Sequence, residues 1–520
     1  MLFERGEHVS FANCGLPYYV GGVITERDAL LLHTPSSLKK RFDITVLTQH
    51  EVTEIDRERK LVHVVNRTNG VHFEESYDKL VLAVGARPLV PNLPGINLPG
   101  IFELRTVPDA DAMKAWIDSQ NVRRAVVVGA GFIGMEVVEN LTHLGIDVTL
   151  IEKADQVLPP FDREMTASLR EELKERGVET ILGDGIVSFQ GQERATDVLL
   201  ESGRVIQGDL FLLGIGVRPD FTLAKNAGLE LGVAGAVHVN QELQTSDPNI
   251  YAAGDVAEMT HLVDKQLRFT PLAGLANKQA RVIGQNVCGS HVTFDGALGT
   301  AIVKFGKATL ALTGLTEKMA TAQNLAYRVS YSTSGHHAGY YPGAKMMTIK
   351  LLVDPASHHV LGAQIAGEEG VDKRIDVIAT GISAKLTIEE MAMLDLAYAP
   401  PFSSAKDPVV MAAMAAEHVI DGDVRIVHSL QEVNDLGAIL VDVRDDAEVA
   451  DGMLPGAIHI PLDELRARIG EIDQGRPVVV YCRSGQRSYF AYQILRRRLT
   501  SEVFNLTGGW IVQEMRKKTA

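Results

Sequence analysis

The sequence has few cysteines, no long hydrophobic run and no excess of basic residues, and each shortage excludes a class of protein. Only Cys14, Cys288 and Cys482 occur in 520 residues, and their wide separation excludes a disulfide framework. No apolar run approaches the roughly 20 residues that cross a bilayer, and the first residues lack the apolar stretch of a signal peptide. The formal net charge of -15 is unfavourable for nucleic-acid binding, which requires a basic surface. We therefore expect a cytoplasmic protein with reduced thiols and with neither a membrane nor a nucleic-acid partner.

The composition is that of an ordinary globular protein, with 46% hydrophobic and 22% charged residues. The length exceeds the roughly 250–300 residues at which single hydrophobic cores stop growing, so several domains are expected. Residues up to about 290 have the apolar strands of α/β domains, and residues after 294 change to alternating strands. A turn at 421–423 precedes a last α/β segment of about 95 residues, which is within domain size.

One strand-helix-strand unit is predicted near residue 130. An apolar strand at 124–129 ends in glycine, a helix is expected over about 132–144, and a second strand follows at 147–151. A run rich in proline and glycine at 88–100 separates this unit from an earlier strand at 79–85. The two strands are therefore expected in different sheets.

Three glycines at the start of this helix have the spacing of a dinucleotide-binding loop. Gly129 would make the tight turn, Gly131 would let the backbone approach a pyrophosphate, and Gly134 would permit close helix packing. Glu152, 21 residues after Gly131, would accept hydrogen bonds from both ribose hydroxyls. A carboxylate at this position favours NADH over NADPH because it repels the 2′-phosphate of NADPH. The adjacent Lys153 weakens that preference.

A second glycine motif lies at the end of another apolar strand, at Gly254 and Asp255. An acidic residue there can bond a ribityl hydroxyl of a flavin, and a helix cap is the alternative. Together with Ala83 and Gly85 and the nicotinamide motif, in this order, the chain resembles the pyridine nucleotide-disulfide oxidoreductase family over residues 1 to about 420. The resemblance implies FAD and NADH as cofactors, with NADPH possible.

The start of the chain differs from the pattern of that family, in which a first strand and a glycine loop bind FAD. Met1 to Glu4 resembles the second strand of that unit, with Glu4 as the ribose-binding acid. We expect that the translation start was placed too late. A truncated, flavin-free sulfur-binding protein is the alternative.

Cys14 stands beside Asn13 and Gly15 with no second cysteine nearby. If it is redox-active, it must alternate with an external sulfur or with a sulfenic acid, whereas a buried structural thiol is the plain alternative. Residues 13–19 resemble the coenzyme A-disulfide reductase branch of the family. The resemblance implies reduction of coenzyme A disulfide, coenzyme A persulfide or polysulfide through Cys14. An NADH oxidase or peroxidase that uses Cys14 as a sulfenic acid is the second interpretation.

The third domain carries tyrosine motifs of the same branch. The resemblance implies that Tyr340 and Tyr398 reach the cysteine of the partner subunit in a homodimer and orient or protonate the leaving thiolate. It also implies that His337 and Lys406 contact coenzyme A. Core tyrosines in a proline-rich turn are the alternative.

Cys482 lies at the end of an apolar strand, in a loop that opens a helix. Loop amides, the helix N-terminus, Arg483 and Arg487 would all favour a thiolate or a persulfide. The segment resembles a single rhodanese domain, and its CxxxxR loop is one residue shorter than the loop of the related phosphatases. The resemblance implies sulfur transfer at Cys482, with Arg483 and Arg487 assisting.

The predicted fold class is α/β, with two dinucleotide-binding Rossmann-like domains, an α+β dimerisation domain and a C-terminal α/β rhodanese domain. The expected boundaries are 1–121 and 233–292 for the two parts of the FAD-binding domain, 122–232 for the NAD(P)H-binding domain, 293–423 for dimerisation and 424–520 for rhodanese. Further cofactor-binding residues implied by the resemblance are Glu4, Ser10, Asn13, Ala83, Gly85, Gly216, Gly254, Asp255 and Ala273. Ser10 and Asn13 are also expected to bind the substrate, and no metal site is expected.

Overall fold

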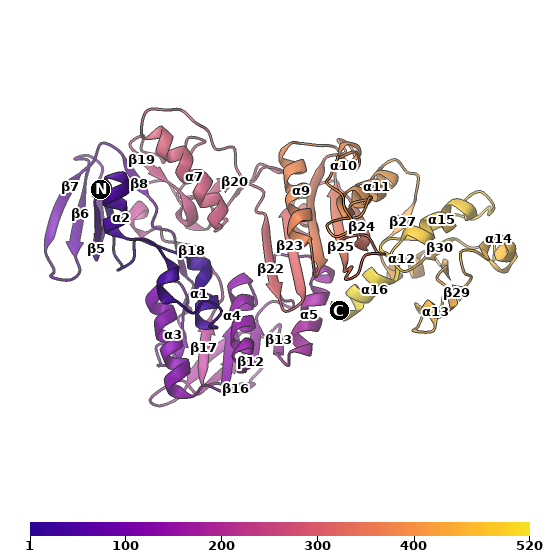
Figure 1. Cartoon of the computed structure of the whole chain (residues 1–520), viewed down its shortest axis with the longest axis horizontal. Helices are drawn as coiled ribbons and strands as arrows, with labels where there is room; N and C mark the ends of the chain where they lie inside the picture. Colours follow the sequence, from indigo (N-terminus) through magenta and orange to yellow (C-terminus); the bar gives the residue numbers. More distant parts are fainter. Residues whose placement is uncertain (520) are drawn as a thin grey trace. The chain divides into compact units, whose positions relative to one another are not determined.

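The protein, described here by a computed structural model over residues 1–519, forms two compact units. Unit 1 contains residues 1–158 and 173–299, and unit 2 contains residues 159–172 and the chain from residue 300 onward. Figure 1 shows the succession of helices and strands along the chain. No helix within the described residues is long and apolar enough to span a membrane.

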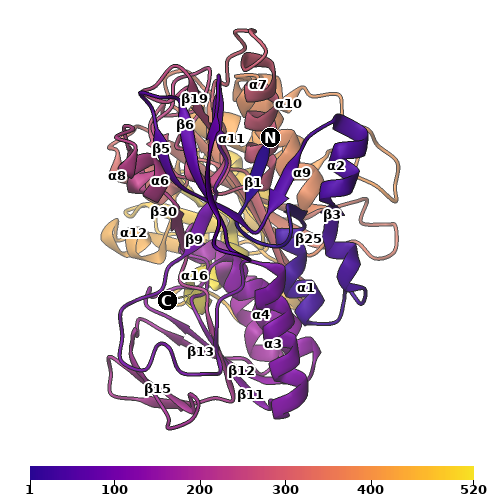
Figure 2. The same ribbon diagram turned by 90° about the vertical axis from the view of Figure 1, so that its left-hand side faces the viewer.

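Unit 1 contains a five-stranded parallel sheet in which the predicted strand-helix-strand unit is confirmed. The strands, in spatial order, are β10 (Ile101–Phe102), β17 (Leu210–Leu213), β11 (Arg124–Val128), β12 (Asp147–Glu152) and β13 (Glu179–Leu182). The connecting helix α4 runs from Phe132 to His143. It packs against α1 (Leu16–Val20), which also contacts α3 (Val107–Gln120), as Figure 2 shows. Helix α4 therefore links the parallel sheet to the segment that follows Cys14.

A small antiparallel sheet completes the core on one side of the parallel sheet. Its strands are β14 (Ile186–Gln190), β15 (Asp197–Leu200) and β16 (Val205–Gln207). Phe189 and Val198 from this sheet pack with Val126 and Phe211 from the parallel strands. These side chains are buried, which is why β17 and the part of β11 after Arg124 are apolar.

The remainder of unit 1 is built around a second pair of parallel strands. These are β8 (Leu80–Leu82) and β19 (Ile250–Ala252), so the strand expected at 79–85 lies in a sheet separate from β11, as predicted. Other strands in this part include β1 (Leu2–Glu4), β4 (Val46–Thr48), β5 (His50–Asp56), β6 (Leu61–Asn66) and β7 (His72–Ser76). Strand β1 pairs in parallel with β4, and helix α7 (Ala273–Asn286) follows β19.

Unit 2 begins with the antiparallel sheet that the alternating pattern after residue 294 predicts. The strands, in spatial order, are β22 (Ala301–Phe305), β23 (Ala308–Gly314), β26 (Val360–Gly367), β25 (Met346–Val353) and β24 (Arg328–Gly335). Helix α9 (Val371–Ser383) packs on β23 and β26, and α11 (Pro408–Ile420) packs on β24 and β25. The short helix α10 (Ile388–Ala392) lies against α11.

The last part of unit 2 is a five-stranded parallel sheet with helices on both faces. The strands, in spatial order, are β27 (Ile426–Val427), β31 (Val503–Leu506), β30 (Val478–Tyr481), β28 (Ile439–Asp442) and β29 (Ile458–His459). Side chains of β30 alternate between two cores, with Val478 and Val480 in one and Val479 and Tyr481 in the other. The helices include α12 (Leu430–Asp435), α15 (Gln486–Leu495) and α16 (Gly509–Thr519).

A buried charge cluster stabilises unit 2. Lys350 on β25 is 0% exposed, and its Nζ lies 2.8 Å from Asp162, 2.6 Å from Glu164 and 2.7 Å from Glu317. Tyr331 on β24 donates a hydrogen bond of 2.6 Å to Glu164. Three carboxylates thus surround one ammonium group, and residues 159–172 are joined to the antiparallel sheet.

We expect Lys350→Met to lower the free energy of unfolding by about 3–5 kcal/mol, because buried carboxylates would lose their counter-charge. Urea denaturation of the purified chain at pH 7 measures this loss. Lys39→Ala is the matched control, since Lys39 forms an exposed pair with Asp43 at 2.6 Å. That substitution should cost less than about 1 kcal/mol, and equal effects of the two substitutions would contradict the role of Lys350.

Candidate active sites at the ends of parallel strands

Two of the three glycines in the loop after β11 have no room for a side chain, and the third has open space beside it. Gly129 has a φ of 106°, and a Cβ there would lie 2.3 Å from the carbonyl oxygen of Gly214. A Cβ on Gly134 would lie 1.9 Å from the carbonyl oxygen of Gly129. A Cβ on Gly131 would meet no atom within 4 Å. The open space lies at the N-terminus of α4, where a pyrophosphate would be stabilised by the helix dipole.

Glu152 stands at the end of β12 beside this loop. Its carboxylate accepts hydrogen bonds from the backbone amides of Ala130 at 2.7 Å and Ala154 at 2.8 Å. Lys153 instead pairs with Glu201 at 2.9 Å, and both side chains are exposed. The effect of Lys153 on the preference for NADH stays a prediction.

The expected flavin residues come from the ends of two adjacent parallel strands. Gly85 follows β8 with a φ of 72°, and Gly254 follows β19 with a φ of 72°. The amide of Gly254 donates to Gln279 of α7 at 2.8 Å, which fixes the turn before Asp255. The helix that begins at Ala273 thus supports the loop of Asp255.

Arg105 belongs to this site although nothing in the sequence singled it out. Its guanidinium donates to the carbonyl oxygen of Val84 at 3.2 Å. Burial lowers the pKa of Arg105, and the carboxylates of Asp255 and Glu4 counteract that effect. Two predicted flavin-site acids, Glu4 and Asp255, therefore lie close enough to the half-buried Arg105 for their charges to act on it. A lone arginine before a helix carries no sequence signal for such a role.

Cys14 lies in a short turn, Asn13–Gly15, directly before α1. The residue is exposed, and no disulfide forms among the described cysteines. Partial burial of the sulfur raises the pKa of the Cys14 thiol, and the nearby carboxylates of Glu136 and Asp255 raise it further. Burial, together with Glu139, raises the pKa of Glu136 to about 7. The protein alone therefore favours the neutral thiol of Cys14.

The two predicted tyrosines of unit 2 are brought together. The hydroxyl groups of Tyr340 and Tyr398 lie 2.8 Å apart, and Tyr340 is 76% exposed. His337 is buried, with Nδ1 3.1 Å from the carbonyl oxygen of Ala338, whereas Lys406 is exposed. The tyrosine pair is thus an exposed pair of hydroxyl groups rather than part of a core.

Arg374 holds the two tyrosine-bearing loops, and sequence reasoning gave it no such role. It is buried and donates to the carbonyl oxygen of His336 at 2.7 Å, to Ser403 at 3.1 Å and to Asp407 at 2.9 Å. The first bond reaches the loop before Tyr340, and the other two reach the loop after Tyr398.

Cys482 ends β30 and is 1% exposed. Its sulfur accepts a hydrogen bond from the amide of Gly485 at 3.2 Å and lies 3.5 Å from the hydroxyl of Ser488. The amide of Trp510 donates to the carbonyl oxygen of Cys482 at 2.8 Å, and this hydrogen bond fixes the backbone at Cys482. The sulfur therefore faces donors, as expected for a site that stabilises a thiolate or persulfide.

The two arginines of this loop differ in their surroundings. Arg483 is exposed. Arg487 pairs with Glu448 at 2.6 Å and with Asp445 at 3.0 Å. The carboxylates of Glu448 and Asp445 therefore offset part of the positive charge that Arg487 would otherwise provide to the sulfur of Cys482.

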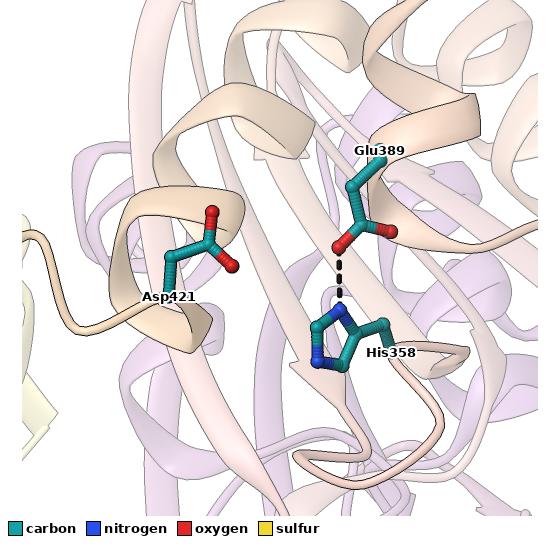
Figure 3. Close-up of side chains that lie close together, drawn as sticks. All are labelled: His358, Glu389 and Asp421. Carbon is teal, nitrogen blue, oxygen red and sulfur yellow. Dashed lines mark hydrogen bonds and ion pairs between the residues drawn. The ribbon is translucent and has the colours of Figure 1, made fainter.

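Two groups of side chains within the described residues have the spacing of metal ligands. One is Asp162, Glu164 and Glu317, where Lys350 already supplies the positive charge. The other is His358, Glu389 and Asp421, shown in Figure 3. His358 Nδ1 lies 2.5 Å from Glu389, so these two side chains already satisfy one another. The expectation of no metal site stays a prediction.

Comparison with known protein families agrees with this arrangement. The family model for the pyridine nucleotide-disulphide oxidoreductases matches residues 1–276, and the model for their dimerisation domain matches residues 300–409. The chain belongs to this family. A rhodanese-like domain follows over residues 427–511.

Relatives of this oxidoreductase share most of its length. A coenzyme A disulfide reductase of Staphylococcus haemolyticus is 39% identical over 80% of this chain and 92% of the relative. The crystal structure of reduced CoADR-RHD from Bacillus anthracis is 44% identical, with a TM-score of 0.96 over 99% of this chain and 93% of that one. An NAD-dependent persulfide reductase from A. fulgidus is 39% identical, with a TM-score of 0.92 over 98% of this chain and 95% of that one.

The glycine loop of this family member permits a matched test. Gly131→Ala should fold normally, because its Cβ meets no neighbour, but should weaken NADH binding by about tenfold or more by filling the space for the pyrophosphate. Gly134→Ala should instead lower the melting temperature, because its Cβ would collide with the Gly129 carbonyl. Isothermal titration with NADH and thermal unfolding separate the two effects. Normal NADH affinity in Gly131→Ala would contradict the assignment.

Proposed function

We propose that this chain reduces disulfides and persulfides with electrons from NADH, through a bound flavin and Cys14, and transfers sulfur at Cys482. One observation carries the proposal. Cys14 is a single thiol without a cysteine partner among the described residues, and it lies close enough to the predicted flavin-site residue Asp255 for the charge of Asp255 to act on it. The same chain holds Cys482 in a loop whose amide donates a hydrogen bond to the sulfur. The names of its relatives, coenzyme A disulfide reductase and persulfide reductase, support the same chemistry.

The residues around both cofactor positions fit the groups that the family implies. Gly129, Gly131 and Gly134 would hold the pyrophosphate of NADH, and Glu152 its ribose. FAD would lie against Ala83 and Gly85 after β8, Gly254 and Asp255 after β19, and Ala273 at the start of α7. When bound, the flavin supplies the means to pass two electrons from the nicotinamide to a sulfur atom.

The role of Cys14 follows from its isolation. As a thiolate it attacks a substrate R–S–S–R′, forms a Cys14–S–S–R bond and releases R′–S⁻. With a persulfide the net reaction is R–S–SH + NADH + H⁺ → R–SH + H₂S + NAD⁺. Because no cysteine lies nearby to resolve the mixed disulfide, its reduction depends on the cofactor. The raised pKa of Cys14 means that substrate or cofactor must help to remove its proton.

The tyrosine pair is suited to donate a proton to the departing thiolate. The hydrogen bond shared with Tyr398 raises the pKa of Tyr340, so Tyr340 carries its proton at neutral pH. We propose a homodimer in which Tyr340 and Tyr398 serve the cysteine of the partner subunit. The matched dimerisation domain supports this assembly.

Cys14→Ser should abolish NADH-dependent sulfide release from coenzyme A persulfide, because Cys14 is the thiol proposed to form the mixed disulfide that the cofactor reduces. Cys288→Ser is the matched control, since Cys288 is also exposed and unpaired in unit 1, and it should retain full activity. Cys482→Ser should retain reduction of small persulfides and lose transfer from bulky donors. Coupled NADH absorbance and sulfide assays measure all three variants.

Two outcomes of the same experiment would favour another function. Oxygen consumption that exceeds disulfide reduction, and that is lost in Cys14→Ser, would indicate an NADH oxidase or peroxidase. A purified chain with no flavin absorbance and no NADH turnover would indicate a flavin-free sulfur-binding protein. Unchanged sulfide release in Cys14→Ser would contradict the proposed function outright.

A further inference from the structure

We propose that Glu448 makes the Cys482 loop selective for persulfides of organic thiols over thiosulfate, by offsetting the charge of Arg487. The inference rests on the proposed sulfur transfer at Cys482 and names the class of donor that this site accepts. It concerns the first step at Cys482 and requires neither Cys14 nor a bound cofactor.

The cations around the loop are almost all paired. Arg444 lies beside the strand end and binds Asp442 through Nη2 at 2.7 Å and Nε at 3.0 Å, with both side chains buried. Arg487 binds Glu448 through Nη1 at 2.6 Å and Nη2 at 2.7 Å. Within residues 1–519, Arg483 is the one loop arginine for which no carboxylate lies within ion-pair distance. The charge of Arg487 is therefore shared with a carboxylate, and Arg483 is the loop arginine that has no carboxylate partner among the described residues.

The pair of Arg487 and Glu448 is also well shielded. Glu448 is 23% exposed, whereas Asp445, the second partner of Arg487, is 70% exposed. The hydrogen bond from Arg487 lowers the pKa of Glu448, so this carboxylate stays ionised at neutral pH. Because solvent screens the charge of Asp445 more strongly, Glu448 is the partner that determines how much of the Arg487 charge reaches the loop.

The two kinds of donor place different demands on this charge. Thiosulfate is a dianion, and attack by the Cys482 thiolate on its outer sulfur breaks the S–S bond, forms Cys482–S–S⁻ and releases sulfite. That step brings three negative charges together at a loop where the charge of Arg487 is shared with Glu448. A persulfide carries at most one negative charge on its sulfur atoms, and attack on its protonated form R–S–SH forms Cys482–S–SH and releases R–S⁻. Transfer from a persulfide therefore brings fewer negative charges to the loop than transfer from thiosulfate.

Glu448→Gln tests the assignment as a gain of function. The substitution keeps a side-chain oxygen for the amide of Asp445, which donates to Glu448 at 3.2 Å. Sulfur transfer to cyanide is measured with thiosulfate and with cysteine persulfide as donors. We expect kcat/KM for thiosulfate to rise at least about tenfold and that for cysteine persulfide to change less than about threefold. Asp445→Asn is the matched control and should raise the thiosulfate value by a smaller factor, because its charge is screened.

A second readout separates charge from structure. In a chain that carries Cys14→Ser and Cys288→Ser, Cys482 is the only remaining thiol. Adding Glu448→Gln should raise the rate of alkylation by the anion iodoacetate relative to neutral iodoacetamide, whereas a merely structural role would change both rates alike.

Two results would overturn the inference. In the wild-type chain, a kcat/KM for thiosulfate equal to or above that for cysteine persulfide would do so without any variant. An unchanged ratio of the two alkylation rates in Glu448→Gln would do so as well. NADH-dependent sulfide release by the wild-type chain is measured separately. Its absence would refute the proposed reductase function, whereas the donor selectivity at Cys482 is decided by the transfer and alkylation assays alone.

Discussion

The candidate sites of both units depend on one constraint, which is that a parallel strand buried on both faces places the groups that bind or react where it ends. Apart from Arg124 at the start of β11, the side chains of strands β11, β19 and β30 are buried in cores on each face. The groups able to bind or react follow immediately, as Gly129 after β11, Gly254 after β19 and Cys482 at the end of β30. Adjacent parallel strands bring such ends to the same edge of a sheet, which places Glu152 beside the glycine loop.

The two cysteines that carry the proposed chemistry are held in opposite ways. Cys14 is an exposed residue, but partial burial of its sulfur, together with the carboxylates of Glu136 and Asp255, raises the pKa of its thiol and favours the neutral form. Cys482 is buried and faces an amide and a hydroxyl that stabilise negative charge on sulfur. The first environment suits a thiol that is reduced and oxidised in each cycle, and the second suits a carrier that stores a sulfur atom.

The sequence predicted the strand-helix-strand unit and the antiparallel strands after residue 294 because those features depend on local spacing. The same spacing of Gly129, Gly131 and Gly134 pointed to one open position and two crowded ones, as the structure has them. The Lys350 cluster was not predictable, since its carboxylates lie far from Lys350 along the chain and no periodicity links them. The contacts of Arg105 and the pairing of Glu448 with Arg487 were missed for the same reason, because contacts between residues far apart in the chain leave no pattern in a single sequence.

Direct observation of the sulfur on Cys14 tests the central claim most closely. Protein incubated anaerobically with coenzyme A disulfide, then digested and analysed by mass spectrometry, should carry coenzyme A on Cys14 and not on Cys288. Addition of NADH before digestion should remove the adduct and release one coenzyme A thiol per Cys14. An unmodified Cys14, or an adduct that persists in the presence of NADH, would contradict the account.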